Sequence, residues 1–308
     1  MYTNFMYDLI SIGSISIDLF FQGDSLTLKD NRFQLAVGGK YVADRFHESL
    51  GGGGANMAIG ARKHGLKTAV SGKIGNNPFK RIILQKLIEN DIDYSLCDFE
   101  DSYYNISSIL LTATGERSIV HYMTPHQHII TNKNQLKEIT KTRMVYLGNL
   151  ADVSLTDRIA LLKFFKDHKI TTIVNLGVKD CRRQVSQLKQ LLEKTDILII
   201  NGHEFAEMVK APYKDIHFKE QVIKWYIPLL INKLVVITEG KKGSYAYLHD
   251  TIYHQPAVKI EKIIDTTGAG DAYTSGFISE YFKSANIQLA MEKGTHYASK
   301  ILQRIGAN

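Results

Sequence analysis

In the second half of this chain, two patterns of apolar residues take turns along the sequence. Short, almost wholly apolar stretches typical of buried strands occupy residues 144–147, 170–176, 197–200 and 234–238. Helical spacing dominates in between, at residues 155–168, 182–194 and 218–231, the last of which Pro228 should kink or break. Strands that alternate with helices over this length predict a parallel sheet with helices on both of its faces.

The first half contains strand patterns joined by longer connections. Residues 9–14 are typical of a central strand, and residues 106–112 and 117–122 of a β-hairpin. The intervening segment 20–50 is long and mixed. Two alternating stretches within it are compatible with short strands, 33–37 and 41–46.

A turn rich in small residues joins the last predicted strand to a helix. Alternation in residues 257–264 predicts the strand, and aromatic residues at helical spacing from Tyr273 to Tyr281 predict the helix. Between them lies Asp265-Thr266-Thr267-Gly268-Ala269-Gly270-Asp271. The free N–H groups of a helix start attract anions, and small residues let a phosphate come close. Asp271 fits there if it faces the other reactant, a hydroxyl about to lose its proton, which predicts phosphoryl transfer.

Residues 265–271 resemble the C-terminal signature of the PfkB, or ribokinase-like, family of carbohydrate and nucleoside kinases. A plain glycine turn with an acidic first helical turn is the alternative interpretation. The resemblance implies an α/β fold, a ribokinase-like three-layer sandwich with a mostly parallel central sheet, helices on both faces and a small β-sheet lid. It also implies a single domain over residues 1–308, with the lid inserted at about 19–50 and about 104–123.

A run of glycines before a helix forms a second motif, Gly51-Gly52-Gly53-Gly54-Ala55-Asn56. It lacks the Gly-Lys-Ser/Thr ending of a P-loop. It resembles the N-terminal PfkB signature, which implies that Gly52, Gly53 and Asn56 bind sugar hydroxyls, although many ribokinases carry Lys at the position of Gly53. A helix N-cap is the alternative role for Asn56. Asp18 follows the first predicted strand, where PfkB enzymes hold the sugar with an Asp; a plain loop Asp is the alternative.

A third motif, Asn201-Gly202-His203-Glu204, follows the strand predicted at 197–200. Taken alone it is a capping box at a helix start. The family uses an Asn-x-x-Glu pair here to arrange Mg²⁺ and its waters beside the phosphates. The resemblance therefore implies that Asn201 lies at the nucleotide and that Glu204 binds Mg²⁺ through water, and both roles are compatible with capping.

The remaining nucleotide contacts rest on resemblance to the family. Residues 238–243 match its Thr-x-Gly-x-x-Gly motif, which implies nucleotide contacts for Thr238, Gly240 and Gly243. A simple hairpin turn is the alternative. Helical spacing continues over residues 287–303, and the family places residues of this last helix, such as Thr295, at the adenine pocket.

Together these motifs imply an ATP- and Mg²⁺-dependent kinase that transfers the γ-phosphoryl group to a hydroxyl of a sugar or sugar-like substrate. Asp271 would accept the hydroxyl proton, and Gly268, Ala269 and Gly270 would offer backbone N–H groups to the phosphoryl oxygens. Three alternatives stay open: a nucleoside (adenosine-type) kinase of the same fold, a phosphosugar kinase, and a catalytically silent sugar- or nucleotide-binding regulator.

Two further hypotheses come from the resemblance, and two from the residues. K⁺-dependent relatives suggest a monovalent cation at Asp265 and Thr267, and the lid-to-lid dimers of other members suggest a homodimer through the lid. We interpret Arg117, at the predicted hairpin turn, as solvent-exposed, with contact to a phosphorylated or acidic substrate as the alternative. Three histidines lack a carboxylate or cysteine at ligand spacing, which argues against a metal site at His121, His126 and His128.

Composition narrows the classes of partner and the cellular compartment that we expect for this chain. The net charge of +7 is spread without a dense Lys/Arg cluster, which indicates a solvated basic surface rather than a nucleic-acid site and suits an anionic cosubstrate. Cys97 and Cys181 show neither a disulfide framework nor metal spacing. Asp8 and Asp18 interrupt the apolar start, so we predict a buried strand rather than a signal or membrane segment. We therefore expect a cytoplasmic protein with a small-molecule substrate and no nucleic-acid or membrane partner.

Overall fold

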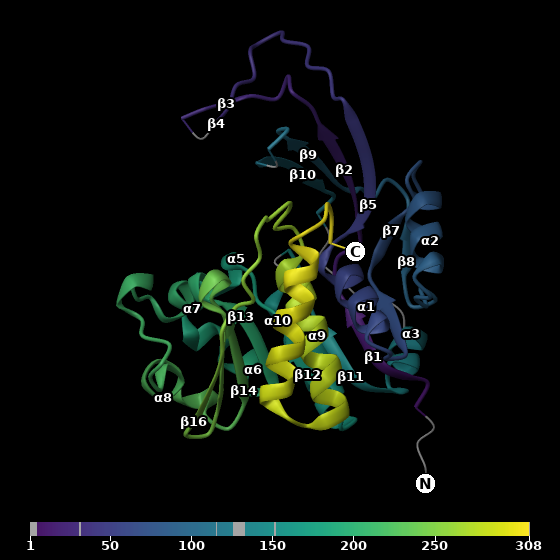
Figure 1. Cartoon of the computed structure of the whole chain (residues 1–308). Helices are drawn as coiled ribbons and strands as arrows, with labels where there is room; N and C mark the ends of the chain where they lie inside the picture. Colours follow the sequence, from purple (N-terminus) through teal and green to yellow (C-terminus); the bar gives the residue numbers. More distant parts are fainter. Residues whose placement is uncertain (1–4, 31, 115, 126–132, 151, 308) are drawn as a thin grey trace.

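An eight-stranded sheet forms the centre of the computed structural model, which describes residues 5–30, 32–114, 116–125, 133–150 and 152–307. The strand order is β16-β15-β14-β13-β12-β11-β1-β6 (Figure 1). The strands from β6 to β14 are parallel, and β15 and β16 add an antiparallel edge. Their bounds are β1 Tyr7–Ile12, β6 Thr68–Ser71, β11 Thr142–Leu147, β12 Thr171–Val174, β13 Ile197–Asn201, β14 Leu234–Thr238, β15 Ser244–Leu248 and β16 Thr251–Gln255.

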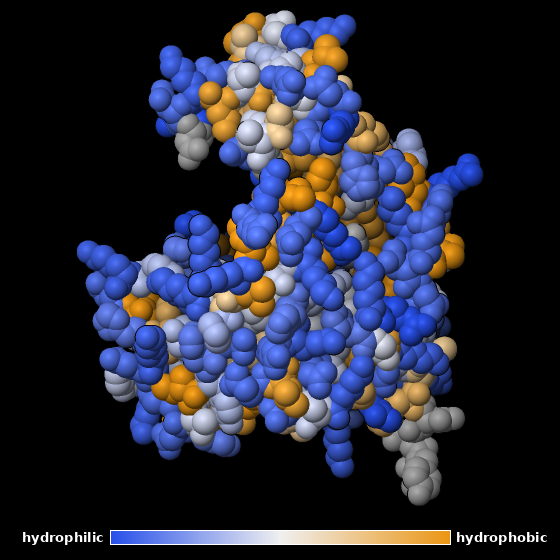
Figure 2. All heavy atoms as spheres, viewed as in Figure 1, coloured by the Kyte–Doolittle hydropathy of each residue, from blue (hydrophilic) through white to orange (hydrophobic). Residues whose placement is uncertain are grey.

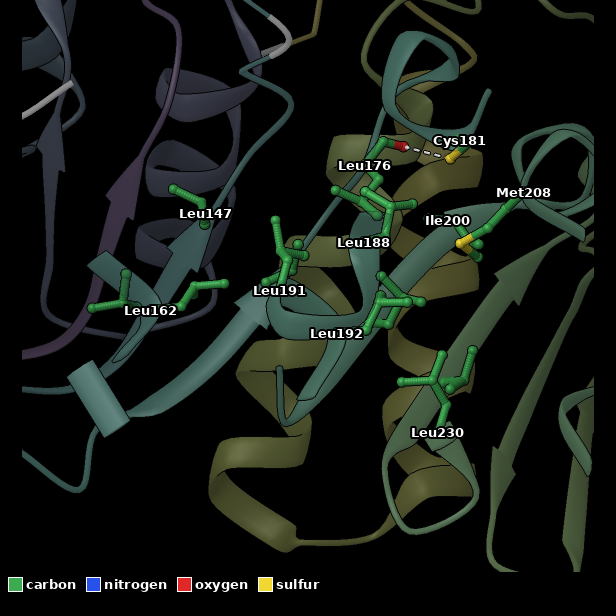
Figure 3. Close-up of a cluster of buried hydrophobic side chains, with 14 of the residues drawn as sticks. Leu147, Leu162, Leu176, Cys181, Leu188, Leu191, Leu192, Ile200, Met208 and Leu230 are labelled. Carbon is green, nitrogen blue, oxygen red and sulfur yellow. Dashed lines mark hydrogen bonds between the residues drawn. The ribbon is translucent and has the colours of Figure 1, made fainter. Parts of the chain in front are cut away.

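Helices cover both faces of this sheet. Alternate residues of a strand point to opposite sides, and since the strands are apolar at nearly every position, both faces must be buried. One face packs against α1 (Gly53–Lys63), α9 (Ala269–Ser284) and α10 (Ile287–Ile301). The other packs against α4 (Leu155–Asp167), α6 (Val185–Glu193) and α7 (Gly202–Val209). Figure 3 shows part of the second core, where Leu147 of β11 lies near Leu162 of α4 and Leu191 of α6. Being buried on both faces, the strands are apolar almost throughout, as the sequence pattern predicts.

The remaining helices are shorter or peripheral. They are α2 Lys80–Glu89, α3 Lys133–Ile139, α5 Val178–Cys181 and α8 Val222–Tyr226, with 3₁₀ turns at Tyr213–Asp215, Pro228–Leu230 and Gly240–Lys242. The helix predicted over 218–231 is shorter than expected: it runs from Val222 to Tyr226. The predicted break before Pro228 is confirmed, since a 3₁₀ turn begins at Pro228.

A second sheet of four strands, here called the lid sheet, lies beyond one end of the central sheet (Figure 1). Its order is β10-β9-β2-β5, with bounds β2 Ser16–Gln22, β5 Arg45–Gly51, β9 Asn105–Leu111 and β10 Arg117–Met123. The segment between β2 and β5 extends away from this sheet (Figure 1). Figure 2 shows an open recess between this segment and the main body. Two two-stranded ribbons complete the strands: β3 Leu28–Lys29 with β4 Arg32–Phe33, and β7 Lys73–Gly75 with β8 Asp98–Glu100.

Some expected boundaries differ from the observed ones. The strand predicted at 257–264 is wrong: β16 ends at Gln255, and the chain then runs as a loop to α9. Residues 257–261 line a cavity instead of joining a sheet, and the apolar Val258 and Ile260 do so together with the charged Lys259 and Glu261 between them. Within 33–46 the structure has only the end of β4 and the start of β5. The helix predicted over 182–194 begins at Val185, after the separate α5.

Candidate active site

A cavity of about 410 Å³ lies where the carboxyl ends of the central strands meet the lid sheet. Residues from both glycine motifs line it, namely Gly52, Gly53, Asn56, Thr267, Gly268 and Asp271. Asp18 of β2 lines it as well, so the structure brings all the predicted substrate-binding residues to one hollow, here called the first cavity. Ligands of open α/β sheets gather at this end of the strands.

The glycine run lets the start of α1 press against the loop after β1. Gly52 has φ +89°, and a Cβ there would lie 2.5 Å from the carbonyl oxygen of Ser14. A Cβ on Gly54 would lie 2.6 Å from the backbone of Gly13. The N-cap role for Asn56 is wrong, because Gly52 holds that position and Asn56 lies inside the helix. Its Nδ2 instead donates to Asp271 Oδ2 at 2.8 Å.

Asp271 lies in the first turn of α9, which begins after Gly268 in the left-handed conformation, φ 74°. A side chain at Gly268 would be strained and would collide with Ala307, whose Cβ lies 2.2 Å from the ideal position. Burial raises the pKa of Asp271 to about 6, and the hydrogen bond from Asn56 acts in the opposite direction. A carboxylate with this pKa is deprotonated at neutral pH and remains a useful base.

Asp18 is a buried strand residue of β2, not the loop residue of the alternative interpretation. It accepts a hydrogen bond from Ser16 Oγ at 3.2 Å. Burial raises the pKa of Asp18 above its ordinary value. The hydrogen bonds from Ser107 and Ser16 and the charge of His121 act in the opposite direction but do not cancel this effect. Its carboxylate therefore lies in a polar patch on the lid-sheet wall of the first cavity.

Sequence reasoning missed the wall that β9 and β10 contribute. Asn105, Ser107, His121 and Met123 line the first cavity. Asn105 and Ser107 are two residues apart on β9, so alternation within the predicted hairpin places them on one face and carries the signal that could have found them. His121 Nδ1 lies 3.2 Å from Ser107 Oγ. His126 and His128 fall outside the described residues, and in the described part of the chain no group of His, Cys, Asp and Glu has metal-site geometry.

A second cavity of about 890 Å³ lies on the other side of the same turn. Thr238, Gly240, Gly243 and Thr295, all predicted nucleotide contacts, line it. So do Ala269 and Gly270, whereas Gly268 and Asp271 line the first cavity. The turn that starts α9 is therefore the wall between the two cavities.

Two glycines shape the second cavity through their backbones. Gly243 has φ +95°, and a Cβ there would lie 2.0 Å from the carbonyl oxygen of Gln255. Gly240, φ +53°, turns the chain in open space. Thr295 is buried, and its hydroxyl has no hydrogen-bond partner among the described residues, so it is available to a ligand.

Asn201 and Glu204 form the predicted capping box of α7. Asn201 Oδ1 accepts from the Glu204 N–H at 2.8 Å, and Glu204 Oε2 accepts from the Asn201 N–H at 2.9 Å. Asn201 pairs with Thr238 at the ends of β13 and β14, beside the second cavity. Burial raises the pKa of Glu204, and both of the opposing hydrogen bonds come from Asn201.

Asp265 is buried and joins three parts of the chain. Its Oδ1 accepts from the N–H and Oγ1 of Thr267, at 2.9 and 2.7 Å, and its Oδ2 accepts from the Gly306 N–H at 3.1 Å. Arg117 of β10 forms an ion pair with Oδ1. Our interpretation of Arg117 as a solvent-exposed turn residue is therefore wrong: its side chain is 27% exposed and is paired with a buried carboxylate.

Comparison with known proteins identifies the class of enzyme. The model of the pfkB family carbohydrate kinase matches residues 6–308, so the chain belongs to the pfkB family, as its signatures predict. It is therefore a kinase of the carbohydrate class, a phosphoryl transferase. None of the helices in the described residues has the length and apolar character needed to cross a membrane.

Individual relatives are distant. The chain is 24% identical to 5-dehydro-2-deoxygluconokinase 1 of Bacillus cereus, over 97% of this chain and 90% of the relative. It superposes on the ribokinase of Arabidopsis thaliana complexed with ribose and ATP with a TM-score of 0.81, at 20% identity, covering 97% and 94% of the two chains. A nucleoside kinase of Methanocaldococcus jannaschii gives 0.72 at 21% identity, covering 99% and 94%. The predicted ribokinase-like fold is confirmed.

The raised pKa of Asp271 predicts the pH dependence of turnover. If Asp271 is the base, kcat should rise with pH through an inflection near its pKa of about 6 and level off above it. Asn56→Ala removes a hydrogen bond that favours the carboxylate, so the inflection should move to higher pH. The measurement is kcat at saturating substrate from pH 5 to 8.5, with circular dichroism to confirm folding. A kcat that stays level from pH 5 to 8.5 in both proteins would contradict the assignment.

Proposed function

We propose that this enzyme uses ATP to phosphorylate a hydroxyl of an uncharged, sugar-like substrate bound in the first cavity, with ATP in the second. The single observation that carries the proposal is the turn between the cavities. It exposes Asp271 on one side and small residues at a helix start on the other. A hydroxyl and a terminal phosphoryl group would meet across this turn.

The roles of the residues follow from their positions. The N–H groups of Gly268, Ala269 and Gly270 lie at the positive end of α9, where they would stabilise charge on the moving phosphoryl group. Asp271 would take the hydroxyl proton, and Asp18 and Asn56 would orient the substrate. The lid sheet would keep out water that competes for the phosphoryl group.

Glu204 fits a magnesium role. Its carboxylate is partly buried, accepts a hydrogen bond from the Asn201 N–H, and has no charged partner among the groups that shift its pKa. A partly buried carboxylate of this kind suits a cation or its bound water. Mg²⁺ bound there would neutralise the β- and γ-phosphate oxygens. For K⁺, a monovalent cation at Asp265 and Thr267 remains a hypothesis, and the ion pair between Arg117 and Asp265 argues against it.

The charge of the first cavity favours a neutral substrate. Three carboxylates line it, those of Asp18, Asp152 and Asp271, and the described lining residues include no Lys or Arg. Lys179 Nζ lies 3.0 Å from Asp152, and both of these side chains are exposed to solvent. A phosphosugar or a sugar acid would bring a further negative charge beside these groups, which costs binding energy. The phosphosugar alternative is therefore the weaker one.

One observation keeps the nucleoside kinase as a second candidate. Met123, Leu150 and Val153 give the first cavity an apolar wall. Such a wall suits the flat face of a base, while Asp18 and Asn56 hold the ribose hydroxyls. A pentose or hexose would leave most of this wall uncovered.

A coupled ADP-release screen tests the proposed function. It compares neutral pentoses and hexoses with their aldonic acids, their 6-phosphates and nucleosides, at fixed ATP and Mg²⁺. We expect turnover with a neutral compound to exceed that with its charged counterpart by at least about tenfold. This is the effect of the repulsion between two unit charges at an intermediate dielectric constant. Preference for the acid or phosphate would overturn the substrate class, and absence of ADP release with every compound would overturn the function.

Asp271→Asn tests the base directly. The substitution keeps the shape and the hydrogen bond to Asn56 but cannot accept the proton, so turnover should fall by at least ~10²-fold. Thermal unfolding should remain cooperative, and isothermal titration should show that ATP still binds. Near-normal turnover in the folded variant would refute the role of Asp271.

Two variants separate capping from metal binding at Glu204. Glu204→Gln preserves the capping box, so stability should stay unchanged while the Mg²⁺ concentration for half-maximal rate rises about tenfold. Glu204→Ala should show the same metal effect and lose about 1 kcal/mol of stability as well. Wild-type Mg²⁺ dependence in Glu204→Gln would show that Glu204 is only a cap.

We also propose that two copies associate through the lid sheet and that the enzyme is cytoplasmic. Both free cysteines are buried, which agrees with a reducing compartment. The edge strands β10 and β5 expose apolar side chains, with Phe46 58%, Val120 67% and Tyr122 56% exposed. Exposed edges with apolar residues favour pairing with another sheet.

Light scattering tests the dimer. Val120→Lys should raise the dissociation constant at least about tenfold, because it places a charge in the apolar contact. Trp225→Lys, at a residue of α8 that is 61% exposed, is the matched control and should leave the mass unchanged. A monomer at all concentrations, or a dimer that Val120→Lys does not weaken, would contradict the proposal.

A further inference from the structure

The carboxylate of Asp265 depends on partners from distant parts of the chain. Thr267 is two residues away, but Gly306 is 41 and Arg117 is 148 residues away. Its side chain has no exposed surface, so its charge needs compensation inside the protein. Arg117 is the positively charged partner among these groups. Removing it would leave a buried charge held only by neutral donors.

Arg117 belongs to the lid sheet. It is the first residue of β10 and pairs with Leu111 of β9. Leu111 is buried with Phe20 and Ile109 in the small core of that sheet. Any change in the position of the lid sheet therefore acts directly on the ion pair with Asp265.

Residues 305–307 make a second connection between the same two parts. Ile305 packs against the lid-sheet core, and a Cβ on Gly306 would lie 3.1 Å from Ser49 Oγ of β5. Ala307 packs against Gly268 at the start of α9. The Gly306 N–H also donates to Asp265. This segment thus fills the space between the lid sheet and the turn, and both of its ends are fixed.

Asp265 lies directly before the turn that separates the two cavities. Its bonds to the N–H and hydroxyl of Thr267 fix the residue that precedes Gly268. The direction of the N–H groups from Gly268 to Gly270 depends on that backbone. Small misplacements of such groups reduce turnover strongly, because transition-state stabilisation requires preorganised donors.

We propose that Arg117 is a positioning residue for phosphoryl transfer: its ion pair with Asp265 links the seating of the lid sheet over the substrate to the orientation of the glycine turn. This inference rests on the proposed function for its kinetic consequence. Arg117 also supplies the positive charge that a monovalent cation would otherwise provide. The wild-type rate should therefore be independent of K⁺.

Kinetics of matched variants test the link. Arg117→Met, which keeps a long apolar stem without the charge, should lower kcat about tenfold or more with a smaller change in the KM values. Arg117→Lys should retain an intermediate rate, and millimolar guanidinium should partly restore Arg117→Met. Adding Asp265→Asn to Arg117→Met should cost less than the sum of the single effects. Arg45→Met, on the exposed edge of the same sheet, is the control and should keep the wild-type kcat.

Hydrogen exchange provides a readout that does not need activity. In Arg117→Met the backbone amides of residues 265–271 should exchange faster than in the wild type, while Arg45→Met should leave them unchanged. Unchanged exchange and wild-type kcat in folded Arg117→Met would overturn the inference. Reduced thermal stability with unchanged kcat and exchange would also overturn it, since Arg117 would then be purely structural. A wild-type enzyme without kinase activity would refute the proposed function, and the exchange result would still decide the link.

Discussion

The left-handed backbone of Gly268 is the constraint on which the rest of the active site depends. It lets α9 begin between the two cavities, with Asp271 on one side and Gly270 on the other. A side chain at this position would be strained and would displace Ala307. A single helix start thereby offers a carboxylate to one ligand and backbone donors to its neighbour.

The charge of the first cavity and the basicity of Asp271 have a common origin. Burial raises the pKa of Asp271 to about 6. A Lys or Arg in the cavity wall would stabilise the carboxylate, lower that pKa and weaken the base. The described wall has none, and Asn56 supplies a neutral hydrogen bond instead. Under the proposed mechanism, the wall that keeps Asp271 basic also disfavours an anionic substrate.

The sequence allowed the architecture to be predicted, and most of the site residues predicted from it line one of the two cavities, because both depend on local patterns. Buried parallel strands are apolar runs, and close backbone approaches such as Gly54 to Gly13 require glycine. Failures arose where the partner is remote. Val258 and Ile260 alternate with polar residues as in a strand, but the whole loop 257–261 lines a cavity formed with distant segments of the chain. The partner of Arg117 lies 148 residues away. Alternation puts Asn105 and Ser107 on one face of the predicted hairpin, but which face meets Asp18 follows from the pairing of β9 with β2.

Asp265 has one partner within its own turn and two from distant parts of the chain. The arrangement of the turn therefore depends in part on contacts outside it. Thr267 would hold the carboxylate whatever the lid sheet does, since it belongs to the same turn. Arg117 and Gly306 contribute only while the lid sheet and residues 305–307 are in place. Because a buried carboxylate is costly without a charged partner, displacement of the lid sheet removes the main compensation for its charge. We infer that the arrangement of the turn depends energetically on the position of the lid sheet, which would tie phosphoryl transfer to a covered first cavity.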